Sequence, residues 1–386
     1  MKQIAGEMAK THTAGRRSLG LAAAIAAAGC LVFGANAATV TITQTVDSVK
    51  WQLNIDASTH KVQLGRGSKL ASTEQACMAV LEGMPSRLAV PSTFTVDGIV
   101  YSVNGVAHRA FPRDRSGVLY NAIFPLDVNI TLGRNVFVSS SISNILFKGA
   151  STAAEGAAAQ TYSTVTMPDL YRASETAEYT QSIVQGCERV RSIVVGPNVK
   201  VDDISKLENL FPAVTDAVLL VPRNSGNMTW NGSDAVDLGG TGNAVAYYGP
   251  AEAFDMQMHD TYVTFVPNTA NGLSDALGWA QTFKTAFDID SRINITNRVA
   301  MTAAVTESML QSVTFDSPPW YITFAVRTQA QMDNVLAAVQ VDVPVIIDIE
   351  GATERIVVPE NREVAILAKG GGTFIRDRRG VVISFR

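Results

Sequence analysis

The sequence has few of the residues that most often build reactive or metal centres, with three cysteines and four histidines among its 386 residues. Three of the histidines, His60, His108 and His259, are far apart and share no metal-ligand spacing. Neither a Gly-x-Ser-x-Gly elbow nor a His-Glu-x-x-His helix occurs. We therefore expect no catalytic site, no metal site and no cofactor, and we predict that the protein is not an enzyme.

Charge is also scarce and balanced. Charged residues make up 17% of the chain, and the formal net charge is -4. Recognition of nucleic acid needs a basic surface, so nucleic acid is not an expected partner. Hydrophobic residues make up 47% of the chain and indicate an ordered protein. The length predicts about two or three domains.

Long apolar runs are absent except near the N-terminus. Arg16 and Arg17 precede the apolar run Leu19–Phe33 and the Ala-x-Ala motif that ends at Ala37. This order is typical of a secretory signal peptide, which we expect to be cleaved after Ala37. The run is shorter than the ~20 residues of a spanning helix, so we expect no membrane span after cleavage. Lipidation at Cys30 is disfavoured, because the apolar run continues past it. We predict a secreted or cell-surface protein.

Loss of residues 1–37 leaves two cysteines, Cys77 and Cys187. Export permits a disulfide between them. In a repeat array, however, each cysteine normally acts as a small buried apolar residue. We therefore expect two free, buried thiols.

Residues 38–88 open with alternating apolar and polar residues, at 39–43 and again at 51–55. Alternation with a period of two predicts strands that are buried on one face. We interpret residues 38–88 as an N-terminal β cap that covers the first unit of a stacked array.

A repeated phrase begins at Ala89. In Ala89–Phe111, Asp97-Gly98 separates two β-rich runs, which predicts a hairpin with a two-residue turn. Weaker copies follow, and we take six positions as equivalent: Pro91, Pro125, Lys148, Pro168, Pro197 and Pro222. Their intervals of 34, 23, 20, 29 and 25 residues average about 26, within the range of leucine-rich repeats. Such units stack into one continuous core.

The run VPSTFTVDGIVYSVNGVAHRAF at 90–111 resembles the opening repeat of BspA-type leucine-rich repeat proteins, which many bacteria export. Ala110-Phe111 and Val136-Phe137 are similar to the Ala-Phe phrase of that family, and Gly186-Cys187 is similar to its Gly-Cys phrase, with Val184 where the family places Phe. The departures are Ser139-Ser140 in place of Gly-Cys and Asp203-Ile204 in place of Ile-Gly. The resemblance covers about residues 85–225, and it implies a leucine-rich-repeat solenoid, which we place at residues 89–250.

The pattern changes after the array. Residues 251–316 are expected to be a helical connector with a strand at 262–266 and a helix at 273–287. In the last part, 317–386, Thr328–Gln331 predicts a capping box before a second helix. Short apolar strands then begin near Val345, Ile356, Val364, Thr373 and Val382.

This C-terminal part resembles the entry to a right-handed parallel β-helix of the pectate-lyase type. Two alternatives stay open for residues 317–386: a small α/β or β-rich domain, or a β-helix that continues in a longer protein. The expected fold class is therefore mainly β with some α, an irregular leucine-rich-repeat solenoid followed by a small α/β or β-helix-like domain.

Four groups of residues are candidates for a functional role. Asp288 and Asp290 are favoured as the end of the helix over a cation site. The glycine-rich stretch 239–242 is favoured as a loop over a phosphate cradle. The Arg376, Asp377, Arg378 and Arg379 turn is favoured as a solvated surface over catalytic groups. Aromatic residues that are expected to be exposed and could stack on sugar rings are Trp230, Tyr247, Tyr248 and Trp279, although Trp279, on a helix, is favoured as a core residue.

The combined expectation is a non-catalytic exported bacterial repeat protein that binds an extracellular protein or glycan, with its ligand-binding residues unknown. Two alternatives remain: the N-terminal part of a polysaccharide-active β-helix enzyme, and a structural spacer that holds another domain away from the cell surface.

Overall fold

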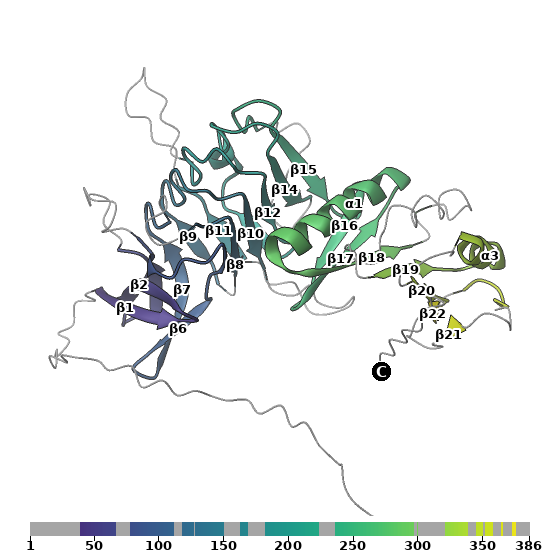
Figure 1. Cartoon of the computed structure of the whole chain (residues 1–386), viewed down its shortest axis with the longest axis horizontal. Helices are drawn as coiled ribbons and strands as arrows, with labels where there is room; N and C mark the ends of the chain where they lie inside the picture. The colour runs from purple at the N-terminus through teal and green to yellow at the C-terminus, as the bar shows by residue number, and fades with distance from the viewer. Residues whose placement is uncertain are drawn as a thin grey trace, which may run out of the picture. The chain divides into compact units, whose positions relative to one another are not determined.

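The described chain is mainly β with few helices, and its strands form sheets of nine, six and seven strands (Figure 1). The structure is a computed structural model that describes residues 39–66, 78–111, 118–126, 128–149, 163–168, 182–223, 236–296, 299, 321–338, 345–349, 352–357, 364–365 and 373–375. The predicted signal peptide, Cys77, Trp230 and the charged turn at 376–379 lie outside the described residues. Residues 38–386 belong to one compact unit.

The nine-stranded sheet begins with the alternating residues near the N-terminus. Strands β1 (Val40–Val46) and β2 (Val49–Asp56) pair antiparallel, followed by β3 (Lys61–Leu64), and β4 (Val80–Glu82) also pairs with β2. Every second residue of β2 is buried, from Val49 to Ile55. The predicted alternating strands are therefore confirmed.

The predicted hairpin is also present. After β5 (Arg87–Ala89), strand β6 (Thr93–Val96) pairs antiparallel with β7 (Ile99–Val106). Asp97 and Gly98 form the turn, with φ of 51° and 79°. Two successive left-handed residues match the right-handed twist of the strands, which is why Asp-Gly is favoured there.

From β7 to β14 the chain alternates between the nine-stranded and the six-stranded sheet, so each strand pairs in parallel with a strand of the preceding turn (Figure 1). The nine-stranded sheet receives β9 (Ile130–Leu132), β11 (Ser163–Thr166) and β13 (Val199–Val201). The six-stranded sheet joins β5 to β8 (Asn121–Pro125), β10 (Asn144–Lys148), β12 (Ser192–Val195), β14 (Val218–Pro222) and β15 (Ala244–Tyr248). A short 3-10 helix, η2 (Ile204–Leu207), lies between β13 and β14.

The corners between strands repeat as the sequence phrases predict. The Phe111 amide donates to the Val136 carbonyl at 2.7 Å, and the Phe137 amide donates to the Ile183 carbonyl at 2.8 Å. The Phe111 and Phe137 rings stack with centroids 5.3 Å apart. These bonds place Val184 at the position of Phe137, which confirms the equivalence of the Ala-Phe phrases.

The departure at Ser139-Ser140 keeps the local geometry of Gly186-Cys187. The Ser139 amide donates to the Gln185 carbonyl at 2.9 Å, and Ser140 Oγ lies 3.7 Å from Cys187 Sγ. Ser139 has a φ of 50°, matching the positive φ of 68° at Gly186. The serine pair therefore occupies the place where the resemblance implies Gly-Cys.

One predicted repeat boundary is wrong. Strand β11, which precedes Pro168, pairs with β9 and β13 in the nine-stranded sheet, whereas Pro125 and Lys148 end strands of the six-stranded sheet. Asn144 lies opposite Asn121, 23 residues earlier, but the next strand of that sheet starts at Ser192, 48 residues later. Both sheets bury their inward faces in a shared core, so an apolar phrase followed by Pro arises on either of them.

The seven-stranded sheet follows. It contains β16 (Phe254–Met258), β17 (Tyr262–Pro267), β18 (Asp290–Ile295), β19 (Tyr321–Ala325), β20 (Val345–Asp348), β21 (Val364–Ala365) and β22 (Thr373–Ile375). Strands β17, β18, β19 and β20 pair in parallel. Helix α1 (Ala270–Thr282) with the π-helical turn η3 (Phe283–Phe287) connects β17 to β18, and α3 (Gln329–Ala338) connects β19 to β20.

This sheet corrects two expectations. Residues 251–316, expected to be a helical connector, contribute β16, β17 and β18 to the same sheet as β19, because the α1 crossover returns the chain to it. Strand β22 pairs antiparallel with β20 and β21. A parallel β-helix would need parallel pairing there, so the described strands follow the α/β alternative.

Two local predictions for the helices are confirmed. The helix expected at 273–287 corresponds to α1 and η3, and it ends at Asp288, whose φ is 56°. At α3, the Gln331 amide donates to Thr328 Oγ1 at 3.3 Å, and Gln331 Oε1 accepts from the Thr328 amide at 3.2 Å. This reciprocal pair is the predicted capping box.

Candidate binding surface

Both faces of the six-stranded sheet are buried. Inward side chains such as Phe124, Ile145 and Ile193 belong to the core shared with the nine-stranded sheet. The outward side chains Leu146, Val194 and Leu220 belong to a second core that includes Phe254 of β16, Phe265 of β17 and residues of α1. Fully buried parallel strands have continuous apolar sequences, as in Ile193-Val194-Val195. The outward face of this sheet is therefore covered by the chain itself.

Polar contacts fix this cover at its margin. The Arg87 side chain of β5 donates from Nε to the Ala286 carbonyl at 2.9 Å and lies 3.3 Å from Asp288. Lys148 at the end of β10 donates to the Asp260 carbonyl at 2.6 Å. The outward face of the six-stranded sheet is therefore not open to a ligand.

The three histidines do not come together as a site. His60 lies in the turn between β2 and β3 with its ring 5.8 Å from that of Tyr101. His108 is half-buried in the corner after β7, and burial lowers its pKa. His259 stacks on Tyr262 at 4.1 Å and is 3.2 Å from Thr264 Oγ1; burial lowers its pKa, with a smaller effect from nearby Arg292.

Asp288 and Asp290 form ion pairs with basic side chains. Lys284 Nζ lies 3.0 Å from Asp288 and 2.8 Å from Asp290, and Arg87 lies beside Asp288. The hydrogen bond and charge of Lys284, followed by the charge of Arg87, lower the pKa of Asp288. Within the part of the chain that the structure describes, no three His, Cys, Asp or Glu side chains group as metal ligands.

The glycine-rich stretch 239–242 is a tight structural loop. Gly239, Gly240 and Gly242 have positive φ, and a Cβ on Gly240 would lie 2.3 Å from the Val214 carbonyl oxygen. The side-chain Nδ2 of Asn243 donates to the Gly239 and Val214 carbonyls at 2.6 and 3.1 Å. Packing against the preceding turn explains these glycines.

Two of the candidate sugar-stacking aromatics are more enclosed than expected. Tyr248, predicted to be exposed, is 1% exposed, and its hydroxyl donates to the Val195 carbonyl at 2.8 Å. Its ring stacks on Phe254, which links the six-stranded sheet to β16. Tyr247 is half-buried under the Arg223 guanidinium at 3.8 Å, and Trp279 packs against the second core. Packing against β16 and the hydrogen bond to Val195, 53 residues earlier, explain the correction for Tyr248.

Cys187 is free and buried, as expected for that residue. Its thiol donates to the Phe137 carbonyl at 2.7 Å. Burial raises the pKa of Cys187 to about 11, so the thiol is neutral and poorly nucleophilic at neutral pH.

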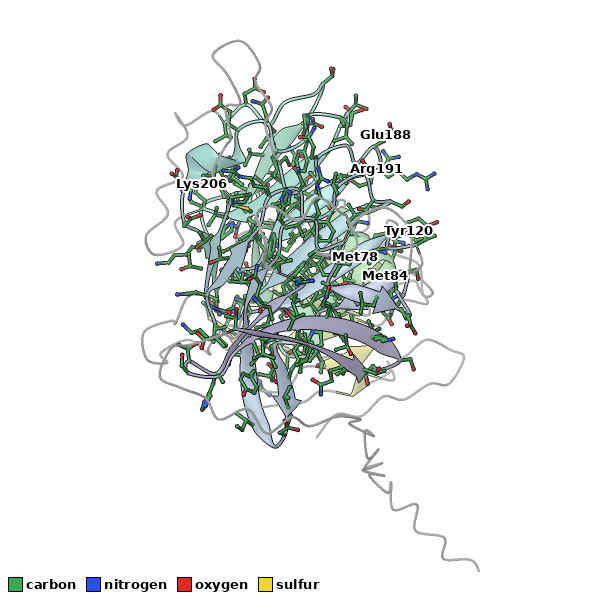
Figure 2. The ribbon with its side chains drawn as sticks, turned by 90° about the vertical axis from the view of Figure 1, so that its left-hand side faces the viewer. Met78, Met84, Tyr120, Glu188, Arg191 and Lys206 are labelled. Carbon is green, nitrogen blue, oxygen red and sulfur yellow. The ribbon has the colours of Figure 1, made fainter. Side chains whose placement is uncertain are left out.

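Within the described residues, exposed large apolar side chains occur at three places that the sequence reasoning missed, and one of them is Val357. Ile99 and Val100 follow the turn of the β6–β7 hairpin, and Val118 and Tyr120 precede β8. Figure 2 shows Met84, Tyr120, Arg191 and Glu188 in succession along one side of the stack. The available signals were apolar residues next to the predicted Asp97-Gly98 turn and apolar residues shortly before β8.

Comparison with known proteins gives one structural similarity. A leucine-rich cell surface protein from Faecalibacterium prausnitzii matches with 9% sequence identity and a TM-score of 0.23, over 67% of this chain and 71% of that protein. No protein-family model matches the chain. The search of curated proteins likewise finds no match. Among the helices of the described residues, none is both long and apolar enough to cross a bilayer.

Proposed function

We propose that the chain is an exported, BspA-type leucine-rich-repeat solenoid that binds an extracellular protein or glycan without catalysing a reaction. The observation that supports it best is the repeated register of the six-stranded sheet. Asn121, Asn144 and Ser192 occupy one position in successive strands and bond side chain to side chain, both at 2.8 Å. Stacked units of this kind expose a long surface of repeated positions, which suits recognition.

Export would place that surface outside the cell. The Arg16-Arg17 pair, the apolar run and the motif ending at Ala37 support a cleaved signal peptide. Expression of the whole chain in a bacterium and N-terminal sequencing of the exported product test this, with Ala38 as the expected first residue. A product that stays in the cytoplasm with its N-terminus intact would refute export.

Binding is tested with the exported protein against a panel of matrix proteins, neutral glycans and acidic glycans. Saturable binding to at least one component is expected. Complete lack of binding across the panel would contradict the proposed function. The polysaccharide-active β-helix alternative gains no support from the antiparallel pairing of β20, β22 and β21, because further coils would need parallel strands.

A further inference from the structure

The N-terminal ends of the strands of the six-stranded sheet carry exposed side chains, although both faces of the sheet are covered. These ends consist of the residues that directly precede the strands, and we call Tyr120, Ser143 and Arg191 the strand-entry edge. Asn121, Asn144 and Ser192 lie opposite one another in the sheet. Tyr120, Ser143 and Arg191, each one residue earlier, are therefore at equivalent positions directly before β8, β10 and β12. Tyr120 is 38% exposed and Arg191 is exposed, whereas Ser143 between them is small and half-buried.

The backbone along this edge is already paired within the chain. The Tyr120 amide donates to the Ser86 carbonyl at 2.9 Å, the Ser143 amide to the Tyr120 carbonyl at 2.6 Å, and the Arg191 amide to the Ser143 carbonyl at 2.7 Å. A peptide that adds to a sheet gains its affinity from free main-chain groups. Because these amides are used, a ligand here must be recognised by side chains.

The side chains offer an aromatic ring and a guanidinium on either side of the small Ser143 side chain. Neighbouring strands lie about 4.8 Å apart, so Tyr120 and Arg191, two strands apart, are separated by roughly 10 Å, with Ser143 between them. An exposed tyrosine presents a flat, partly apolar ring. Arginine binds a carboxylate through two parallel hydrogen bonds. Arg189, also exposed, adds a positive charge, and the exposed Glu188, beside Arg191 in Figure 2, adds a negative one.

We propose that the strand-entry edge binds an acidic polysaccharide, a chain of sugar rings that carry carboxylates. One ring stacks on Tyr120, and a carboxylate further along the chain pairs with Arg191 across Ser143. This inference rests on the proposed binding function and specifies the ligand class and the surface.

The test uses the exported protein and measures binding to polygalacturonate, to its fully methyl-esterified form and to polyglutamate by calorimetry. Polygalacturonate is expected to bind with an affinity that falls as salt rises, because the contacts are exposed. The esterified polymer, which keeps the rings and loses the charge, and polyglutamate, which keeps the charge and lacks the rings, are both expected to bind at least tenfold more weakly. Arg191→Gln and Tyr120→Ala are each expected to weaken binding roughly ten- to a hundredfold.

Arg66→Gln and Val100→Ala are the matched controls, because both residues are exposed and lie outside the strand-entry edge. They are expected to bind like the unchanged protein, and all four variants should keep its thermal midpoint. Equal binding of polyglutamate, or unchanged binding of both edge variants, would overturn the inference. If polygalacturonate fails to bind while another panel component binds, the inference is wrong and the proposed function stands. If nothing binds, both fail.

Discussion

At the scale of single residues, Asn144 joins three strands of the six-stranded sheet through its amide. Its Nδ2 donates to Asn121 Oδ1 at 2.8 Å, and its Oδ1 accepts from Ser192 Oγ at 2.8 Å. Asn144→Ala removes both bonds and leaves two partly buried groups unpaired, so we expect a loss of about 1–3 kcal/mol in the free energy of unfolding. Urea denaturation measures it.

Asn54→Ala is the control, because Asn54 lies on the less buried side of β2. Its effect should be within about 0.5 kcal/mol, as for most surface substitutions. Equal stability of the two variants would show that the side-chain bonds between the strands add nothing.

Cys187 makes stability depend on alkaline pH. Burial raises the pKa of its thiol from 9.0 to about 11. The folded state therefore keeps a proton that the unfolded state loses, so this contribution is full below about pH 9 and is lost as the pH rises toward 11. Cys187→Ala should lose stability less steeply between pH 9 and 11, as measured by urea denaturation at each pH. Parallel pH profiles for the two proteins would contradict this.

The burial of some residues can be predicted from the neighbouring sequence, whereas the burial of others cannot. Cys187 belongs to the Gly186-Cys187 phrase of the resembled repeat, which lies in a corner of the stack, so its burial could be predicted. Tyr248 ends the last strand of the six-stranded sheet, and its ring is covered by Phe254 from the next sheet. Its hydroxyl bonds to the Val195 carbonyl, 53 residues earlier, and no local pattern around Tyr248 encodes that contact, so its burial could not be predicted.

At the scale of elements, the β6–β7 hairpin depends on its turn. Gly98 has a φ of 79°, and a Cβ at this residue would meet nothing within 4 Å. Gly98→Ala therefore introduces backbone strain without a clash, and we expect a loss of about 1–2 kcal/mol in unfolding free energy. Asp97→Asn is the control and should be neutral, because Asn also accepts a left-handed φ. A Gly98→Ala protein as stable as the control would mean that the turn relaxes.

Elements with local signals could be predicted, whereas their assignment to sheets could not. The Asp97-Gly98 turn and the Thr328 capping box each depend on a few adjacent residues. Pro168 is predicted to be equivalent to Pro125, but the strand before it, β11, belongs to the nine-stranded sheet, because its apolar phrase fits the inward face of either sheet. Strand β18, Asp290–Ile295, alternates in burial, but its partner β17 lies across a helical crossover that alternation does not specify.

At the scale of the whole molecule, the packing of β16, β17 and α1 over the six-stranded sheet could not be predicted from the sequence. Leu146, Val194 and Leu220 are the outward residues of three apolar strands, and a sequence cannot distinguish an outward face awaiting a ligand from one that the chain itself covers. The second core includes these residues together with Phe265 and Phe283. We therefore expect these outward side chains to stabilise the seven-stranded sheet and α1 through the second core.

Leu219 and Leu220 test this coupling, because they are neighbours in β14, both fully buried, and belong to different cores. Each substitution to Ala should cost about 2–5 kcal/mol. Leu220→Ala removes contacts on the side of the second core, so hydrogen exchange should accelerate in α1 and β17. Leu219→Ala should act first on the strands of the nine-stranded sheet. If exchange in α1 responds equally to both substitutions, the two cores do not act separately; if it responds to neither, the seven-stranded sheet is stabilised without its contact to β14.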